Sequence, residues 1–216
     1  MSDQPVRRRY HAPARRAGAR ATRDRICHAA EELFVLDGYA RTSIHAIAGQ
    51  AGVSEATVYL TFPDKAALLD AAIRRAIGQS TGENLAEILA APPAALLAHL
   101  AESHAALMQR AARLIALGEG AARMDAELRP LRERAHDGLR AAMRAIADRL
   151  DEAGLLRTGL PPQAAADALY AIANETTYLR LTHGCGQSPE RYAGWLTATL
   201  EATLLDPQRA TGAQRA

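Results

Sequence analysis

The chain has 216 residues, of which 49% are hydrophobic and only 4% aromatic, enough apolar material for one large domain or two small ones. Alanine, the strongest helix former, is abundant, and alternating apolar and polar runs are absent, so a β-rich fold is excluded. No apolar run is long enough to span a membrane, and Arg7, Arg8 and Arg9 stand where a secretion signal would be apolar. We therefore expect a soluble, all-helical, cytoplasmic protein with no signal peptide.

Positive charge gathers at the N-terminus, although the net charge is only +2. Residues 1–20 contain six arginines against one acidic residue, Asp3, and have few apolar groups to bury. Such a composition favours disorder. We predict a disordered basic arm over residues 1–21 that reaches DNA phosphates or a minor groove; the alternative is a solvated tail that aids solubility.

Residues 22–78 are expected to form one compact domain of three short helices followed by a longer one. Helix-capping residues alternate with glycine and proline, which interrupt helices. In chain order these capping and breaking residues are Thr22, Gly38, Thr42, Ser43, Gly52, Ser54, Pro63 and Asp64.

Residues 79–216 are expected to form a helical bundle, because their apolar residues recur every three or four positions. The expected helices cover about 83–90, 93–117, 124–153, 162–183 and 189–205, which gives about nine in the whole chain. Pro130 marks either the true start of the third of these helices or a kink within it.

The segment from Thr42 to Lys65 reads as a helix, a tight turn at Gly52 and a second helix. Ile47 and Val58 can form a small apolar contact between the two helices. The outer face of the second helix would then remain exposed and polar. This geometry is typical of a helix-turn-helix, whose second helix enters the major groove of DNA.

The same region carries a dense set of matching positions: Gly38, Tyr39, Thr42, Ser43, Ile47, Ala48, Ala51, Gly52, Val53, Ser54, Thr57, Tyr59, Phe62, Lys65, Leu68 and Leu69. This set closely resembles the DNA-binding signature of the TetR family of transcriptional regulators, over roughly residues 20–70. The resemblance implies an all-α fold, with an N-terminal three-helix DNA-binding domain and a C-terminal bundle that dimerises and accepts a small ligand.

The resemblance also implies which residues meet DNA. Phosphate contacts would come from Thr42, Tyr59, Thr61 and Lys65. Positions at or beside base edges would be His45, Glu55, Ala56, Thr57 and Leu60, and Ser43 and Ser54 complete the set. His or Tyr is more usual in the family at the position of Thr61, whose side chain has a shorter reach.

Other roles remain open for several of these side chains. Tyr39 and Phe62 are expected to be core residues, and Tyr59 could be a buried aromatic rather than a phosphate contact. His45 could be a solvated helix residue, and Glu55 could simply stabilise the start of its helix.

We expect a homodimer, because one short recognition helix reads few base pairs and specificity generally comes from two-fold pairing. The resemblance implies that the last two helices form its interface. Polar or adaptable residues on the apolar stripes suggest an effector pocket. The candidates are His104, Met108, Met143, Tyr170, Asn174 and Tyr178, for each of which ordinary core packing is the alternative.

We therefore predict a repressor that binds a pseudo-palindromic DNA operator as a dimer and is released by a small, mostly hydrophobic effector. The alternatives are an activator, a corepressor-dependent repressor and a helical interaction protein without an effector. No catalytic motif stands out, and Cys27 and Cys185 belong to no metal-binding spacing. We expect no enzyme activity, metal or cofactor.

Overall fold

The computed structural model describes residues 12–78 and 81–206. Within these ranges the chain forms ten α-helices and no strand, which confirms the all-α fold. The α-helices are α1 (Ala12–Asp37), α2 (Ile44–Ala51), α3 (Glu55–Thr61), α4 (Lys65–Ile77), α5 (Thr81–Ala90), α6 (Leu96–Ala121), α7 (Arg129–Glu152), α8 (Pro162–Ile172), α9 (Glu175–Leu179) and α10 (Pro189–Leu204). A 3-10 helix (Pro93–Ala95) precedes α6, and a π-helical turn (Arg180–Gly184) follows α9.

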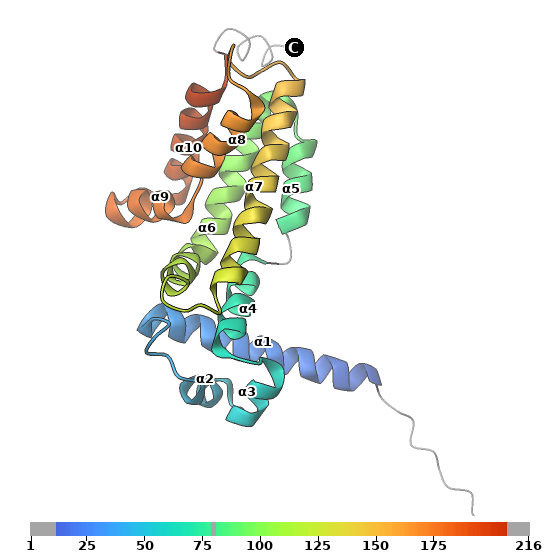
Figure 1. The fold of residues 1–216 in the computed structure, drawn as a ribbon, viewed down its shortest axis with the longest axis vertical. Coiled ribbons are helices and arrows are strands. Elements are labelled where there is room, and N and C mark those ends of the chain that lie inside the picture. Colours follow the sequence, from blue (N-terminus) through green and yellow to red (C-terminus); the bar gives the residue numbers. More distant parts are fainter. Residues whose placement is uncertain (1–11, 79–80, 207–216) are drawn as a thin grey trace, which may run out of the picture.

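The molecule is elongated, with the first four helices at one end and a helical bundle at the other (Figure 1). Helix α6 belongs to both ends, because it packs on α10 in the bundle and on α1 and α4 below it. In the described part of the chain, no helix combines the length and the apolar character needed to cross a bilayer.

Helix α1 begins at Ala12 rather than after Thr22. The expected disordered arm over 1–21 is therefore wrong for residues 12–21, and residues 1–11 lie outside the described ranges. The described side chains of this added segment are exposed, so burial does not hold it in place. Alanine and arginine are strong helix formers, and adding turns to an existing helix avoids the cost of starting a new one.

The short helices that follow α1 begin at the residues that the sequence predicted. Ser43, Ser54 and Asp64 cap α2, α3 and α4, and each side-chain oxygen accepts a hydrogen bond from the main-chain N–H three residues further on. Gly52 ends α2 with a φ of 66°, a left-handed conformation that glycine adopts without strain. These local signals set the turn between α2 and α3.

The chain buries two hydrophobic cores. The upper core joins the bundle helices through residues such as Leu100, Ile146 and Leu196. The lower core contains Ile47 of α2 and also Leu114 of α6, so it extends beyond the first four helices. The boundary expected near residue 78 therefore divides the chain but not the packing of its side chains.

A glycine lies in the contact between α4 and α6. A Cβ atom at Gly118 of α6 would lie 2.7 Å from Cδ1 of Ile73 on α4. That spacing is closer than carbon atoms tolerate. The absence of a side chain at Gly118 thus leaves room for the end of the Ile73 side chain.

The single helix expected over 162–183 is interrupted, so that prediction is wrong. Helix α8 ends before Ala173, which has a non-helical ψ of 80°, and Asn174 caps the new helix α9. Asparagine favours such a break because its side chain bonds to nearby main-chain groups in place of the helical ladder. Pro130, by contrast, lies in the first turn of α7 and marks its start rather than a kink.

Candidate functional site

Helix α3 is fixed to the domain along one side. Val58 is only 1% exposed and shares the lower core with Ile47, as the spacing of the two residues predicted. At the end of α3, Nη1 of Arg23 donates to the carbonyl of Thr61 at 3.3 Å, and the same guanidinium lies 4.2 Å from the centre of the Phe62 ring. Phe62 itself is buried, as expected. Helix α3 is thus held by the lower core on one side and by Arg23 at its C-terminal end.

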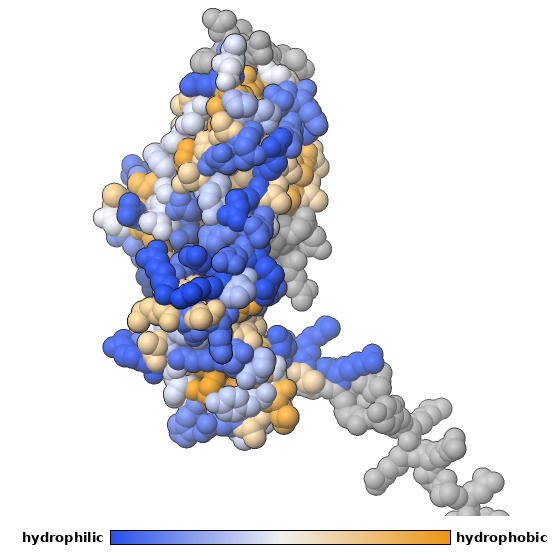
Figure 2. Space-filling view, in the orientation of Figure 1, coloured by the Kyte–Doolittle hydropathy of each residue, from blue (hydrophilic) through white to orange (hydrophobic). Residues whose placement is uncertain are grey.

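The opposite side of α3 faces solvent. Ser54, Glu55 and Ala56 are exposed, while Tyr59 and Leu60 are 55% and 88% exposed. Figure 2 shows orange patches among blue at the lower end of the molecule, where Figure 1 places α2 and α3. Tyr59 is therefore not a buried aromatic, and the outer face of α3 combines apolar and polar side chains.

Three hydroxyl groups on α3 and its cap interact within the helix. Oγ1 of Thr61 donates to the carbonyl of Thr57 at 2.7 Å, and Oγ1 of Thr57 lies 2.9 Å from Oγ of Ser54. Thr57 and Thr61 are half-buried, whereas Ser54 is exposed. Of these predicted DNA-binding residues, Ser54 is the most open to a ligand.

Thr42 serves the fold instead of facing solvent. It is 3% exposed, and its Oγ1 donates to the main-chain carbonyls of Leu33 at 3.1 Å and Gly38 at 2.8 Å. The phosphate contact implied for this side chain therefore does not fit its geometry. The neighbouring Ser43 is exposed and accepts from the N–H of Ala46 as the cap of α2.

His45 and Glu55 form a pair across the open face. Nδ1 of His45 on α2 lies 2.8 Å from Oε1 of Glu55 on α3, and the two side chains are 85% and 49% exposed. The pair steadies the Glu55 carboxylate beside the outer face of α3. Glu55 also lies in the first turn of its helix, where a negative charge is favourable.

Lys65 lies at the junction of the two ends of the molecule. Its Nζ is 4.4 Å from the centre of the Tyr39 ring and 3.5 Å from the carbonyl of Ala40. Burial lowers the pKa of Lys65, and the charge of Asp125 opposes this shift. The Tyr39 hydroxyl donates to Oδ2 of Asp125 at 2.8 Å, so this half-buried tyrosine links the first four helices to the connection between α6 and α7. The sequence offered no signal for that link.

In the bundle, the predicted effector residues lie in different surroundings. His104 meets Tyr192, a residue that the sequence reasoning missed: its Nδ1 lies 3.1 Å from the Tyr192 hydroxyl. The Tyr178 ring packs edge-on against Tyr192, with the ring centres 4.9 Å apart. Nε2 of His104 is buried and has no hydrogen-bond partner of ordinary geometry in the described structure. Burial lowers the pKa of His104 to about 4, against a smaller opposing effect of the Ala173 carbonyl.

The other predicted effector residues do not join this cluster. Asn174 is a helix cap, and Met143 is a buried core residue. The Tyr170 hydroxyl lies 2.6 Å from Nδ1 of His136, whose Nε2 lies 2.9 Å from Oε1 of Glu119. These contacts join α8 to α7 and α6, so Tyr170 has a structural role in the bundle. Within the described ranges, no three or more His, Cys, Asp or Glu side chains are grouped so as to hold a metal ion.

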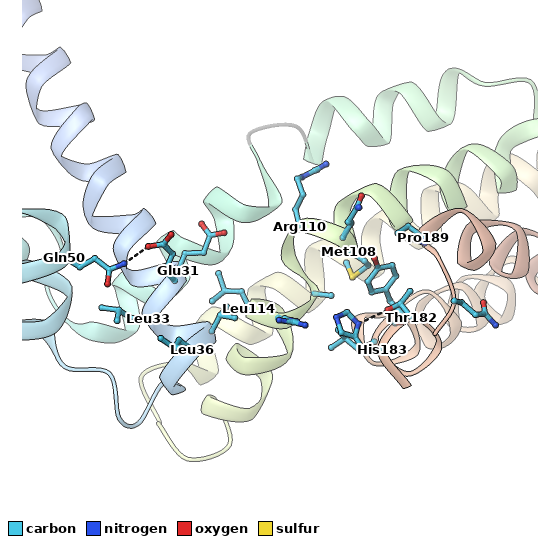
Figure 3. A pocket seen from close by; sticks show the side chains of 18 residues that line it. Glu31, Leu33, Leu36, Gln50, Met108, Arg110, Leu114, Thr182, His183 and Pro189 are labelled. Atoms are coloured by element: carbon cyan, nitrogen blue, oxygen red, sulfur yellow. Dashed lines mark hydrogen bonds between the residues drawn. The ribbon is translucent and has the colours of Figure 1, made fainter. Parts of the chain in front are cut away.

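A groove of about 1030 Å³ lies between the two ends of the molecule. Figure 3 shows Leu33 and Leu36 on its α1 side, Met108 and Leu114 on α6, and Thr182 across from α1. Tyr178 also lines the groove, so two of the predicted effector residues, Met108 and Tyr178, reach it. His104 and Tyr170 are not among its lining residues.

Comparison with known proteins places this fold among bacterial regulators. Residues 26–72 match the family model described as bacterial regulatory proteins, tetR family. No curated protein matches the chain.

Solved structures share the fold over most of both chains. A putative transcriptional regulator from Saccharomonospora viridis, in complex with choline, is 23% identical over 85% of this chain and 97% of its own, with a TM-score of 0.71. NalD from Pseudomonas aeruginosa, the secondary repressor of the MexAB-OprM multidrug efflux pump, is 25% identical over 88% and 98%, with a TM-score of 0.71. FadR from Bacillus subtilis, in complex with stearoyl-CoA, is 22% identical over 82% and 96%, with a TM-score of 0.70.

The fold is therefore that of a helix-turn-helix regulator, in which a helical bundle packs on the helix-turn-helix domain. Residues 26–72 therefore form a DNA-binding domain of the tetR family, as the resemblance in the sequence implied, and the chain as a whole shares its fold with solved transcriptional regulators.

Proposed function

We propose that this chain binds a pseudo-palindromic operator as a homodimer and represses transcription until a small, mostly hydrophobic effector releases it. The observation that carries the DNA-binding part is the outer face of α3, a helix fixed from behind by Val58 with Tyr59 and Leu60 held out toward solvent. Its length and exposure suit a major groove. Such a regulator acts where the DNA lies, so we place it in the cytoplasm, and we assign it no catalysis.

Dimerisation follows from how little DNA one α3 can read. A helix of seven residues spans few base pairs, so two copies related by a two-fold axis are needed for a specific site. The exposed side of α10 carries Gly194, Ala198 and Ala202 at intervals of four, which allows another helix to approach closely. We propose that α8 and α10 form this interface.

The effector part rests on the bundle. Met108 and Tyr178 line the groove between the two ends, and His104 lies one helical turn from Met108. A ligand there would be mostly apolar, with polar groups that meet lining side chains such as Arg110 and Thr182. Relatives of this fold have been solved with choline and with stearoyl-CoA, which supports a small organic effector. The repressor role of NalD supports the direction of regulation.

The link from effector to DNA would be a change in the spacing of the two α3 helices. The Tyr39–Asp125 hydrogen bond and the shared lower core connect the bundle with the DNA-binding end. A ligand shifts such an equilibrium only through its different affinities for the two states, and near-complete switching needs a difference of about 5.5 kcal/mol.

The test is selection of bound sequences from random DNA by the purified full-length protein. We expect an inverted repeat. Tyr59→Phe should then weaken binding of the dimer to it by about 100-fold, or about ten-fold for the hydrogen bond to a phosphate that each subunit loses. Lys65→Ala should reduce the salt dependence of binding by about one phosphate contact per subunit. Tyr170→Phe, which removes a phenol hydroxyl in the bundle, is the matched control and should leave DNA affinity unchanged.

Equal affinity for every sequence at physiological salt would contradict the proposal and favour a helical interaction protein. A compound screen against the selected DNA then fixes the sign of regulation. Release of DNA by a compound supports the proposed repressor, whereas tighter binding indicates a corepressor. Increased transcription on addition of the protein to a reconstituted promoter would indicate an activator.

A further inference from the structure

The side chain of Leu60 is among the most exposed large apolar side chains of the described ranges, together with those of Met124 and Leu36. It is 88% exposed, although it belongs to a short helix that the protein holds firmly in place. Ala56 lies one turn earlier on the same side of α3 and is also exposed. Ala56 and Leu60 thus form an apolar strip along the helix, which gains nothing from contact with water.

Polar groups border this apolar strip. Tyr59 is 55% exposed beside Leu60, and the Glu55–His45 pair lies beside Ala56. A stable protein interface buries about 800 Å² on each partner and needs a broad patch. One leucine and one alanine between polar groups are too few for that, but they are enough to contact a single methyl group.

The major groove offers one apolar group on its base edges, the C5-methyl of thymine. Hydrogen-bonding side chains can read the other bases, but an aliphatic side chain distinguishes only this methyl. We propose that the apolar strip of Ala56 and Leu60 reads a thymine in each half-site of the operator through its C5-methyl group. This inference rests on the proposed DNA-binding function and names the base that one face of α3 recognises.

The experiment removes that methyl group alone. Each thymine of the selected operator is replaced in turn by deoxyuridine in both half-sites, which keeps every hydrogen bond of the base pair. We expect one position at which the change weakens binding of the wild-type protein by about 15-fold, or about four-fold for each methyl group lost. Fluorescence anisotropy at fixed salt measures the two affinities.

The Leu60→Ala variant completes a double-mutant cycle, in which each of two proteins is measured with each of two operators. It should bind the thymine and deoxyuridine operators with equal affinity, because the side chain that contacts the methyl group is missing. Tyr59→Phe is the matched control on the same helix: it should weaken binding to both operators and keep the 15-fold ratio between them. Since Leu60 is exposed, its replacement should leave the thermal midpoint unchanged, so a loss of the ratio cannot come from unfolding.

The outcomes separate this inference from the proposed function. If the protein selects an operator but no thymine methyl has an effect that Leu60→Ala removes, the inference is wrong and the DNA-binding function stands. If the protein selects no sequence at all, the proposed function fails and the inference fails with it.

Discussion

At the scale of single residues, the hydroxyl of Thr42 is committed to the protein's own main chain. Thr42→Val keeps the shape of the side chain but removes the hydroxyl that donates to the half-buried carbonyls of Leu33 and Gly38. We expect the free energy of unfolding to fall by about 0.5–1.5 kcal/mol, the usual net value of a hydrogen bond, as measured by denaturant titration. The affinity of the folded protein for DNA should not change.

Thr42→Ser provides the control, because it keeps the hydroxyl and should retain most of the stability. A Thr42→Val variant that is as stable as the wild type but binds DNA poorly would restore the phosphate contact that the family resemblance implied.

His104 makes stability depend on pH. In the folded protein burial lowers its pKa from 6.5 to about 4, so between these values the unfolded chain binds more protons. The free energy of unfolding therefore falls as the pH is lowered from about 6.5 to about 4, by about 3 kcal/mol in total from this residue. Denaturant titrations across this range measure it.

Carboxylates titrate in the same range, so the informative quantity is the difference between the wild type and His104→Gln. The variant should lack this component and show a shallower loss of stability on acidification. Identical pH profiles would mean that the imidazole is as easily protonated in the fold as in water.

At the scale of elements, the break between α8 and α9 depends on Asn174. Its Oδ1 accepts from the N–H of Thr177 at 2.8 Å, and its Nδ2 donates to the carbonyl of Ala171 at 2.7 Å. Asn174→Ala should lower the free energy of unfolding by about 1 kcal/mol, the usual value of a cap. Asn174→Asp keeps the cap acceptor and should lose less; equal losses in the two variants would argue against capping.

The sequence predicts helices well where the signal is local. Ser43, Ser54 and Asp64 were expected to start helices and do, because a cap needs only the N–H three residues ahead. The start of α1 at Ala12 and the break at Asn174 were missed. In both places two local preferences compete, and helical propensity prevailed at the first while side-chain hydrogen bonding prevailed at the second.

The candidate site could be predicted only in part for a related reason. The exposure of Tyr59 and Leu60 follows from helical period alone. The partners of Tyr39 and His104 lie 86 and 88 residues away in the chain, where spacing gives no information. Long-range packing therefore decided which of the predicted effector residues lie together.

At the scale of the whole molecule, the proposed dimer can be broken by charge. Ala198 lies in the middle of the exposed row of small residues on α10, so Ala198→Arg should place a bulky cation between the two subunits. We expect a monomer in sedimentation experiments. The operator affinity should fall by about 100-fold, because the α3 helices of the two subunits are no longer linked.

Ala106→Arg is the matched control, since Ala106 is exposed on α6 and lies outside α8 and α10. It should remain dimeric and keep its affinity. An Ala198→Arg protein that still sediments as a dimer would move the interface to another face.

The lower core has a practical consequence for building hybrid regulators. Leu114 and Leu128 complete the packing of the DNA-binding end, and Gly118 leaves room for Ile73. A hybrid that joins the first 78 residues to the helical bundle of another regulator would replace these partners with unrelated side chains. Gaps or steric clashes would then form in the lower core. A chimaera that also transplants the matching stretch of α6 and the following connection keeps that joint intact.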